Sequence, residues 1–124
     1  MDWHLDVNQY RVIANEHAPG ICVPEGIHRD GHQFVKIMVF RRQRISGAEL
    51  TLYPLDADEP FFTRIIEEGQ AIVIDDTRMR HYATDISAIA RQGGYRDYIG
   101  TCLNRWDERK YGPEFEANAL AGAC

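Results

Sequence analysis

The stretch QFVKIMVFRRQRISGAELTLYPL, residues 33–55, decides the fold of this chain. It contains two runs rich in β-branched and aromatic residues, at 33–41 and 48–55, and each run has the length of a strand. Between them, Ser46-Gly47 can supply the positive φ angle that a tight turn requires. The stretch therefore predicts two neighbouring β-strands.

The rest of the chain repeats this pattern. Five further runs of the same kind occur, at 9–15, 60–66, 70–75, 80–84 and 95–103. They are separated by Gly, Pro, Asp and Asn, and sustained helical periodicity is almost absent. About seven or eight short antiparallel strands at this spacing predict an all-β fold, either a sandwich or a barrel-like jelly roll.

Length and composition narrow the class of protein. A chain of 124 residues is one domain. We expect a core over residues 1–106 and a loosely ordered tail over 107–124, where Gly, Pro and other small residues accumulate. The cysteines, Cys22, Cys102 and Cys124, match neither a disulfide framework nor a metal-ligand spacing, so free thiols are expected.

Charge and hydropathy indicate which partners to expect. The formal charge is −5 at pH 7 and the basic residues are scattered, so no nucleic-acid partner is expected. The basic cluster of Arg41, Arg42 and Arg44 is interpreted as a strand end that emerges into solvent. No apolar run approaches the ~20 residues that span a bilayer, and the N-terminal sequence MDWHLDVNQY lacks the parts of a signal peptide. We therefore predict a cytoplasmic protein without membrane contact.

The segment PEGIHRDGH, residues 24–32, carries the candidate chemistry. It leads into a predicted strand, and residues i and i+2 of an extended segment point to the same side. His28 and Asp30 can therefore converge on one metal ion while Arg29 faces away. His81, in the sequence DDTRMRH, can complete the set, because the strands of a jelly roll return the chain to the same end of the barrel.

Two imidazoles and one carboxylate on one face of an octahedron leave three positions open, as in non-haem iron(II) oxygenases. A closed structural zinc site would fill its positions with protein ligands. If the co-substrate is 2-oxoglutarate, its distal carboxylate needs a buried cation, and arginine can bind it with two parallel hydrogen bonds. Arg96 is the candidate, because it lies on the apolar run at 95–103, where an unpaired charge is costly.

Each of these features alone has a simpler explanation. A lone histidine is more often a packed or surface residue than a ligand, and Arg96 could form a surface ion pair with its neighbour Asp97. The order His-x-Asp, then His, then Arg, at strand-compatible spacing in an all-β chain, is what favours the metal site. The remaining histidines do not fit this order and are expected to have surface or supporting roles: His4, His17 and His32.

These motifs resemble those of a bacterial group of iron(II)- and 2-oxoglutarate-dependent dioxygenases that includes free L-amino-acid hydroxylases such as L-isoleucine dioxygenase. The resemblance rests on NQYRVIA (8–14), PEGIHRDG (24–31), GAELTLY (47–53), DDTRMRHYATDI (75–86) and GYRDYIGTCL (94–103). It implies a double-stranded β-helix, which is a cupin-like jelly roll, with metal ligands at His28, Asp30 and His81 and the 2-oxoglutarate arginine at Arg96. Members of that group carry a further N-terminal region that this chain is expected to lack.

The resemblance also implies the reaction and its cofactors. Iron(II), 2-oxoglutarate and O2 would be used to hydroxylate a small substrate, expected to be a free L-amino acid, with succinate and CO2 as co-products. Thr51 and Tyr53 are candidates for contact with the co-substrate, and Glu25 and Arg78 for contact with the substrate; a purely structural role is the alternative for all four. A homodimer would bury the barrel face that a shorter chain leaves uncovered.

Two other functions remain open. One is a truncated or non-catalytic β-sandwich that binds a small carboxylate without turnover. The other is a cupin-like metalloenzyme that does not use 2-oxoglutarate, for which His32 and Glu49 are candidates as extra ligands. Iron-dependent consumption of 2-oxoglutarate would exclude the first, and loss of 2-oxoglutarate binding in Arg96→Ala, with metal binding intact, would disfavour the second.

Overall fold

The computed structural model describes residues 1–109, 114 and 117–118. The strands in this part of the chain are β1 (Trp3–Ala14), β2 (Phe34–Gln43), β3 (Ile45–Gly47), β4 (Glu49–Pro54), β5 (Phe62–Ile65), β6 (Ala71–Asp75), β7 (Met79–Ala83), β8 (Ile86–Ala88) and β9 (Gly94–Arg105). A 3-10 turn, η1 (Trp106–Glu108), follows β9. The all-β class predicted from the sequence is confirmed.

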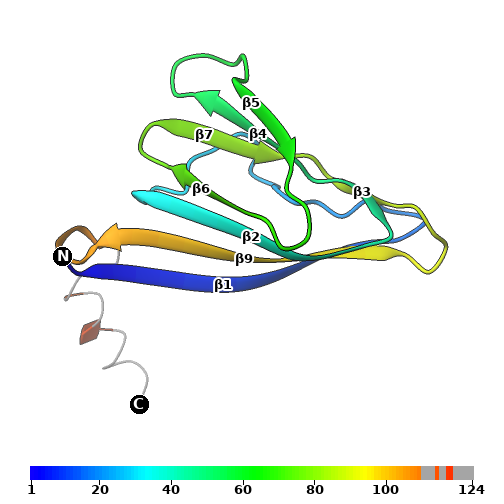
Figure 1. The fold of residues 1–124 in the computed structure, drawn as a ribbon, viewed down its shortest axis with the longest axis horizontal. Coiled ribbons are helices and arrows are strands. Elements are labelled where there is room, and N and C mark those ends of the chain that lie inside the picture. Colours follow the sequence, from blue (N-terminus) through cyan, green and yellow to red (C-terminus); the bar gives the residue numbers. More distant parts are fainter. Residues whose placement is uncertain (110–113, 115–116, 119–124) are drawn as a thin grey trace.

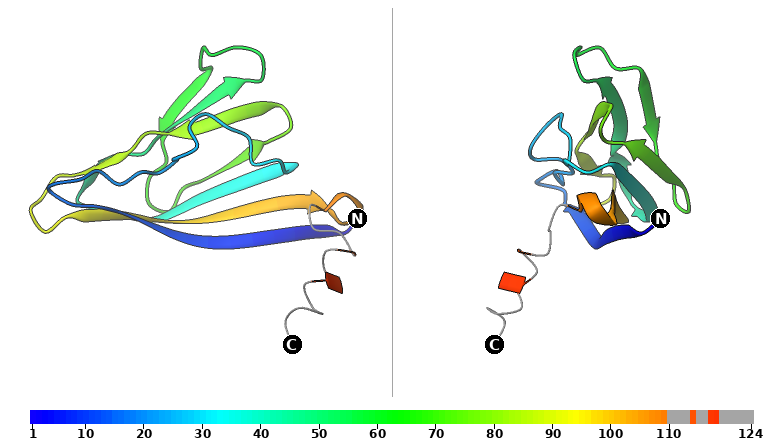
Figure 2. Two further views of the ribbon diagram at one scale, coloured as in Figure 1. Left: turned by 180° about the vertical axis from the view of Figure 1, so that it is seen from behind. Right: turned by 90° about the vertical axis from the view of Figure 1, so that its left-hand side faces the viewer.

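The strands form three antiparallel sheets. The largest has the strand order β1-β9-β2-β6, the second has the order β5-β4-β7, and the third pairs β3 with β8. Figure 1 shows the two larger sheets as opposite layers that come together near β3, and Figure 2 shows the same layers from two further sides. The inner faces of the two layers therefore look toward each other.

All the strands expected from the sequence form, and the structure adds two short ones. β3 and β8 have three residues each and pair with one another, and runs this short carry no periodicity that a sequence pattern can detect. β1 begins at Trp3 rather than near residue 9, because it pairs with β9 from Trp3 opposite Arg105 onward. This long-range pairing overrides the low strand propensity of Asp6 and Asn8.

Apolar side chains fill part of the space between the layers. The larger cluster of buried residues consists of Val39, Leu50, Leu52, Ile66 and Ile74. A smaller cluster consists of Ala14, Ala48 and Ile86. Burial of this apolar surface holds the sheets together. Leu50 belongs to the larger cluster and also lines the cavity described below, so the core adjoins the candidate site.

The expectation that the basic cluster at the end of β2 lies in solvent is wrong for Arg42. Its side chain is only 11 % exposed, and a bulge between Val39 and Arg41 places it opposite Arg96 on β9. The guanidinium donates to the carbonyl oxygen of Gly47 at 3.0 Å. One extra residue in a bulged strand changes which side chains face inward, and this change is not visible in the sequence.

The turn predicted at Ser46-Gly47 depends on glycine. Gly47 has a φ of +94°, in the region that L residues with a side chain rarely adopt. A Cβ atom at this position would lie 2.1 Å from the carbonyl oxygen of Asp85. Gly47 therefore permits both the turn and the close approach of the chain that enters β8.

Two sequence predictions concern the C-terminal residues. The loosely ordered tail predicted at 107–124 lies mostly outside the described residues, as does Cys124, and it stays a prediction. Cys22 is a free thiol, as expected. No helix in the described residues is both long and apolar enough to cross a membrane.

Candidate functional site

The main chain brings His28 and His81 together. The two residues lie opposite each other in an isolated antiparallel bridge, in which the amide of His28 donates to the carbonyl of His81 at 3.0 Å and the reverse bond measures 2.8 Å. A pair that exchanges both hydrogen bonds presents its side chains on the same face. The imidazole centroids are 4.3 Å apart. The segment before β2 is thus attached to β7, and two histidines distant in the sequence become neighbours.

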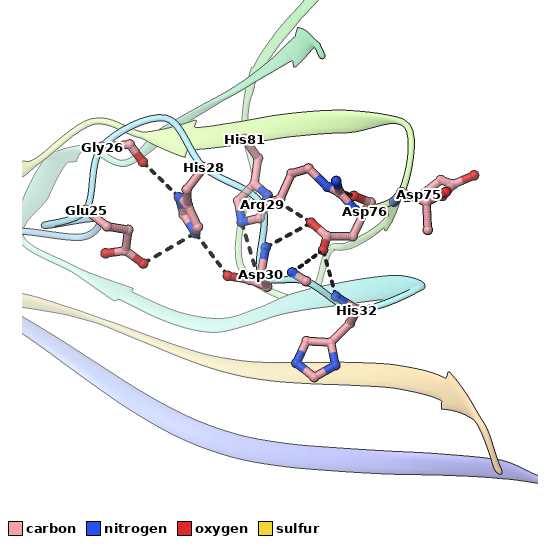
Figure 3. Close-up of polar contacts among 11 residues, drawn as sticks. Glu25, Gly26, His28, Arg29, Asp30, His32, Asp75, Asp76 and His81 are labelled. Carbon is pink, nitrogen blue, oxygen red and sulfur yellow. Dashed lines mark hydrogen bonds and ion pairs between the residues drawn. The ribbon is translucent and has the colours of Figure 1, made fainter. Parts of the chain in front are cut away.

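Asp30 lies beside both rings (Figure 3). Its Oδ1 is 3.0 Å from Nε2 of His28, and its Oδ2 is 3.5 Å from Nε2 of His81. Gly31, with a φ of +83°, turns the chain directly after Asp30. Across His28, Asp30 and His81, one potential ligand atom from each residue lies within 4.8 Å of the others. The structure therefore brings together the three residues predicted to hold a metal.

The far sides of the two rings fit a metal centre as well. Nδ1 of His28 is 2.8 Å from the carbonyl oxygen of Gly26, which can only accept a hydrogen bond. Nδ1 of His81 is buried, has no hydrogen-bond partner among the described residues and lies 3.9 Å from Oδ1 of Asp76. A histidine that carries its proton on Nδ1 presents the lone pair of Nε2 to a metal. Both rings thus have an oxygen on the Nδ1 side and a shared carboxylate on the Nε2 side.

The pKa of His81 gives a pH-dependent prediction. Burial lowers this pKa below its usual 6.5, and Asp30 and Asp76 oppose the shift without reversing it. The unfolded chain therefore binds more protons than the folded chain just below pH 6.5, so the stability of the metal-free protein falls as the pH is lowered through that window. We expect the free energy of unfolding, measured with urea, to fall less between about pH 7 and about pH 5.5 in His81→Gln than in the wild type. An equal loss in both would assign the effect to other groups.

A cavity of about 560 Å³ opens beside the three residues. Its floor is the inner face of the four-stranded sheet. Side chains alternate between the two faces of a strand, so every second residue along β1 and β9 faces the cavity. Opposed pairs on β1 and β9 form this floor: Asp6 and Cys102, Asn8 and Gly100, Tyr10 and Tyr98, and Val12 and Arg96. Leu50, Ala83 and the candidate metal ligands also line the cavity. Its volume suits a small molecule.

Arg96 supplies a buried cation to this cavity. Its residue is 4 % exposed, and its Nε is buried without a hydrogen-bond partner among the described residues. The guanidinium lies 4.5 Å from the ring centroid of Tyr98. Burial lowers the pKa of Arg96 below its usual value, but an arginine side chain stays charged in proteins. A charge in such a place is costly unless an anion joins it.

The alternative pairing of Arg96 with Asp97 does not occur. Asp97 instead forms two hydrogen bonds of 2.8 Å with Arg11, its register partner on β1. The Arg11 side chain hydrogen-bonds to Asp97 and thereby lowers the pKa of that carboxyl group. Arg96 and Asp97 are consecutive residues of a strand and point to opposite faces.

The opposite end of the cavity is acidic. Asp6, Glu25 and Asp30 line it near Tyr10, whose ring stacks on Tyr98 with 4.9 Å between centroids. Burial raises the pKa of Tyr10 above 10.0, and the nearby Cys102 and these carboxylates raise it further. The cavity therefore has a cationic end at Arg96 and an anionic end near the candidate metal ligands.

The other residues singled out from the sequence fall in different places. Glu25 lines the cavity, and its Oε1 is 3.3 Å from Nε2 of His28. Thr51 and Tyr53 lie on β4 and do not line the cavity, which Leu50 of the same strand does. Arg78 is exposed in the turn between β6 and β7. The structure thus brings Glu25 to the candidate metal ligands and leaves the other three outside the cavity.

The remaining candidates concern histidines and the possible extra ligands. His32 lines the cavity, is buried, and has its Nδ1 2.6 Å from Nδ2 of Asn104. Glu49 and His17 are exposed. His4 is half-buried on β1, with its Nδ1 enclosed. None of these four belongs to the set of converging ligand atoms among the described residues.

Sequence reasoning missed the tyrosines and the carboxylate of Asp76. Tyr98 could have been found, because it lies two residues after Arg96 and so on the same face of the strand. Tyr10 follows only from the register of β1 against β9. Asp76 had no signal of its own, since it stands next to Asp75 in a turn that is rich in polar residues.

Comparisons with known proteins bear on the family and the fold of the chain. Residues 1–101 match the model of the family described as 2OG-Fe dioxygenase. No curated protein matches the chain significantly.

Solved structures share the fold. A BsmA homologue from Methylobium petroleophilum PM1 superposes with a TM-score of 0.73 at 24% identity, over 83% of this chain and 41% of that one. IDO from Bacillus thuringiensis superposes with a TM-score of 0.74 at 15% identity, over 83% of this chain and 45% of that one. The Fe(II)/α-ketoglutarate-dependent dioxygenase TqaL superposes with a TM-score of 0.70 at 12% identity, over 83% of this chain and 42% of that one. The predicted jelly-roll class is confirmed, and the chain spans less than half the length of each of these structures.

Proposed function

This chain belongs to the 2OG-Fe dioxygenase family, and we propose that it is an iron(II)- and 2-oxoglutarate-dependent dioxygenase that hydroxylates a free L-amino acid. One observation carries the proposal. His28, Asp30 and His81 converge at a cavity that also contains the buried guanidinium of Arg96, which has no carboxylate partner among the described residues. A metal-binding face and a buried cation in one cavity are what a chelating dicarboxylate requires.

The proposed roles follow from the atoms that each residue presents. His28 and His81 through Nε2, and Asp30 through its carboxylate, would hold iron(II) and leave three positions for 2-oxoglutarate and O2. When bound, iron(II) supplies the oxidative decarboxylation of 2-oxoglutarate to succinate and CO2, coupled to hydroxylation of a substrate C–H bond. Arg96 would bind the distal carboxylate of 2-oxoglutarate and so fix its orientation.

The acidic end of the cavity supports an amino-acid substrate. The carboxylates of Asp6 and Glu25 line this end together with the amide of Asn8. Carboxylates attract an ammonium group and form charge-assisted hydrogen bonds with it. Glu25 is the residue that we propose for the substrate ammonium, because it also approaches His28. The apolar side chains of Ile37 and Leu50 would limit water in the same cavity.

A homodimer and a cytoplasmic location stay predictions. Support for the homodimer comes from apolar residues exposed on the outer face of the four-stranded sheet: Leu5, Val7, Ile13 and Val73. A second copy would cover them. Size-exclusion chromatography with light scattering would determine the oligomeric state.

The proposed function is tested by anaerobic titration of the purified chain with iron(II) and then 2-oxoglutarate. We expect a visible charge-transfer band from the chelate, followed on admission of O2 by succinate formation that increases with the correct amino acid. A folded chain that binds iron(II) and gives no band would favour a metalloenzyme that does not use 2-oxoglutarate. A folded chain that binds no metal would favour a non-catalytic carboxylate-binding protein.

A further inference from the structure

The carboxylate of Asp76 is fully buried beside the candidate metal centre. Asp76 lies in the turn between β6 and β7, and its relative exposure is 0 %. Removing a carboxylate from water is unfavourable unless hydrogen bonds replace the lost hydration. The hydrogen-bond partners of this side chain therefore indicate which part of the structure the buried carboxylate stabilises.

Three consecutive backbone amides surround the Asp76 side chain (Figure 3). The amide of Asp30 donates to Oδ1 at 3.2 Å, and the amides of Gly31 and His32 donate to Oδ2 at 2.7 and 2.9 Å. Successive amides that converge in this way form a concave anion-binding site. Here the anion is a side chain of the protein, and it holds the turn that carries the metal ligand Asp30.

The main chain of Asp76 reinforces the same attachment. Its amide donates to the carbonyl of Gln33 at 3.0 Å. Its carbonyl accepts from Nε of Arg29 at 2.6 Å. Arg29 therefore helps to join the segment before β2 to the β6–β7 turn.

The same carboxylate also faces the second histidine. Oδ1 of Asp76 lies 3.9 Å from Nδ1 of His81, and that nitrogen is buried without another hydrogen-bond partner among the described residues. The distance exceeds that of a hydrogen bond, but no other acceptor in the described chain lies within hydrogen-bonding distance of this nitrogen. A carboxylate in this place favours the tautomer with the proton on Nδ1, which leaves Nε2 as the ligand atom.

We infer that Asp76 is the positioning residue of the metal centre, acting on two ligands at once. Its Oδ1 accepts the amide of Asp30 and faces Nδ1 of His81, so one carboxylate sets the place of the first ligand and the tautomer of the second. The neighbouring Asp75 has a different role, because its side chain accepts bonds from Thr77 within its own turn. The inference rests on the proposed function, since it concerns residues that would bind iron(II).

The test compares Asp76→Asn with Asp75→Asn as the matched control. An asparagine keeps the size of the side chain but has only one acceptor oxygen. Its NH2 group would have to face backbone N–H groups that now donate to the Asp76 carboxylate. Substitutions of groups that orient metal ligands typically weaken metal binding about 10- to 100-fold. We expect a loss of that size for Asp76→Asn and less than about threefold for Asp75→Asn, measured by anaerobic calorimetric titration with iron(II) and with cobalt(II).

A second measurement on the wild type keeps the inference testable if Asp76→Asn does not fold. Long-range ¹H–¹⁵N NMR correlations of histidine-labelled protein report which ring nitrogen of His81 carries the proton. We expect the Nδ1–H tautomer in the wild type and in Asp75→Asn, and a shift toward Nε2–H in folded Asp76→Asn. A merely structural role would not change the tautomer.

The outcomes separate this inference from the proposed function. A wild-type chain that binds neither metal contradicts the proposed function and the inference that rests on it. Tight metal binding by the wild type with equal affinity in folded Asp76→Asn, or an Nε2–H tautomer in the wild type, overturns the role of Asp76 and leaves the dioxygenase proposal standing.

Discussion

Replacing His81 with alanine is expected to weaken iron(II) binding by more than about 100-fold. Losses of about 10- to 100-fold already follow from changes to groups that only orient metal ligands, and this substitution removes one of the proposed ligands itself. Besides His28 and His81, the imidazole of His32 also lines the cavity, and its Nδ1 is in contact with Asn104. His32 does not belong to the set of converging ligand atoms in the described residues, so we do not expect it to replace His81.

Anaerobic calorimetric titration with iron(II) measures this loss, and circular dichroism shows whether the variant is folded. His17→Ala is the matched control, because His17 is an exposed histidine away from the cavity. We expect the control to bind iron(II) with the affinity of the wild type. Iron(II) binding by folded His81→Ala within about threefold of the wild type would mean that His81 does not hold the metal.

Replacing Arg96 with methionine is expected to weaken 2-oxoglutarate binding by about 100-fold or more while leaving iron(II) affinity unchanged. Each hydrogen bond between charged groups contributes about 1.5–3 kcal/mol, and a guanidinium can form two with one carboxylate. Two bonds at the lower limit correspond to about a 100-fold change in affinity. Tyr98 stacks against the guanidinium but carries no charge that could replace it.

Titration of the iron-loaded protein with 2-oxoglutarate, followed by the charge-transfer band, measures the effect of Arg96→Met. Arg91→Met is the control, since Arg91 is exposed in the connection between β8 and β9. We also expect the metal-free Arg96→Met chain to be at least as stable to urea as the wild type, because it no longer buries an unpaired charge. Unchanged 2-oxoglutarate affinity would remove Arg96 from the binding site.

Much of the fold could be predicted because strand periodicity is a local property. The runs at 33–41 and 70–75, for example, became β2 and β6 with small changes at their ends. What could not be predicted depends on pairing across the chain. The bulge that turns Arg42 inward and the early start of β1 both arise from contacts with β9.

The candidate site shows the same division. His28 and Asp30 were predicted together because their spacing in an extended segment decides their common direction. The bridge that attaches this segment opposite His81 is formed by main-chain groups, which every residue possesses, so no side-chain pattern predicts it. Asp76 could not be distinguished from Asp75, because only the three-dimensional path of the turn places one carboxylate inside and leaves the other at the surface.

The place of β1 in the four-stranded sheet also affects the order in which the protein acquires its structure. In the described chain β1 is an edge strand whose single neighbour is β9, and Trp3 lies opposite Arg105. During synthesis β1 must therefore wait until β9 has left the ribosome, and contacts this distant in sequence form slowly. β9 then joins β1 to β2 and closes the floor of the cavity in the same step. A chain that ends before β9 thus has no complete floor for the cavity, because β9 is the strand that pairs with both β1 and β2.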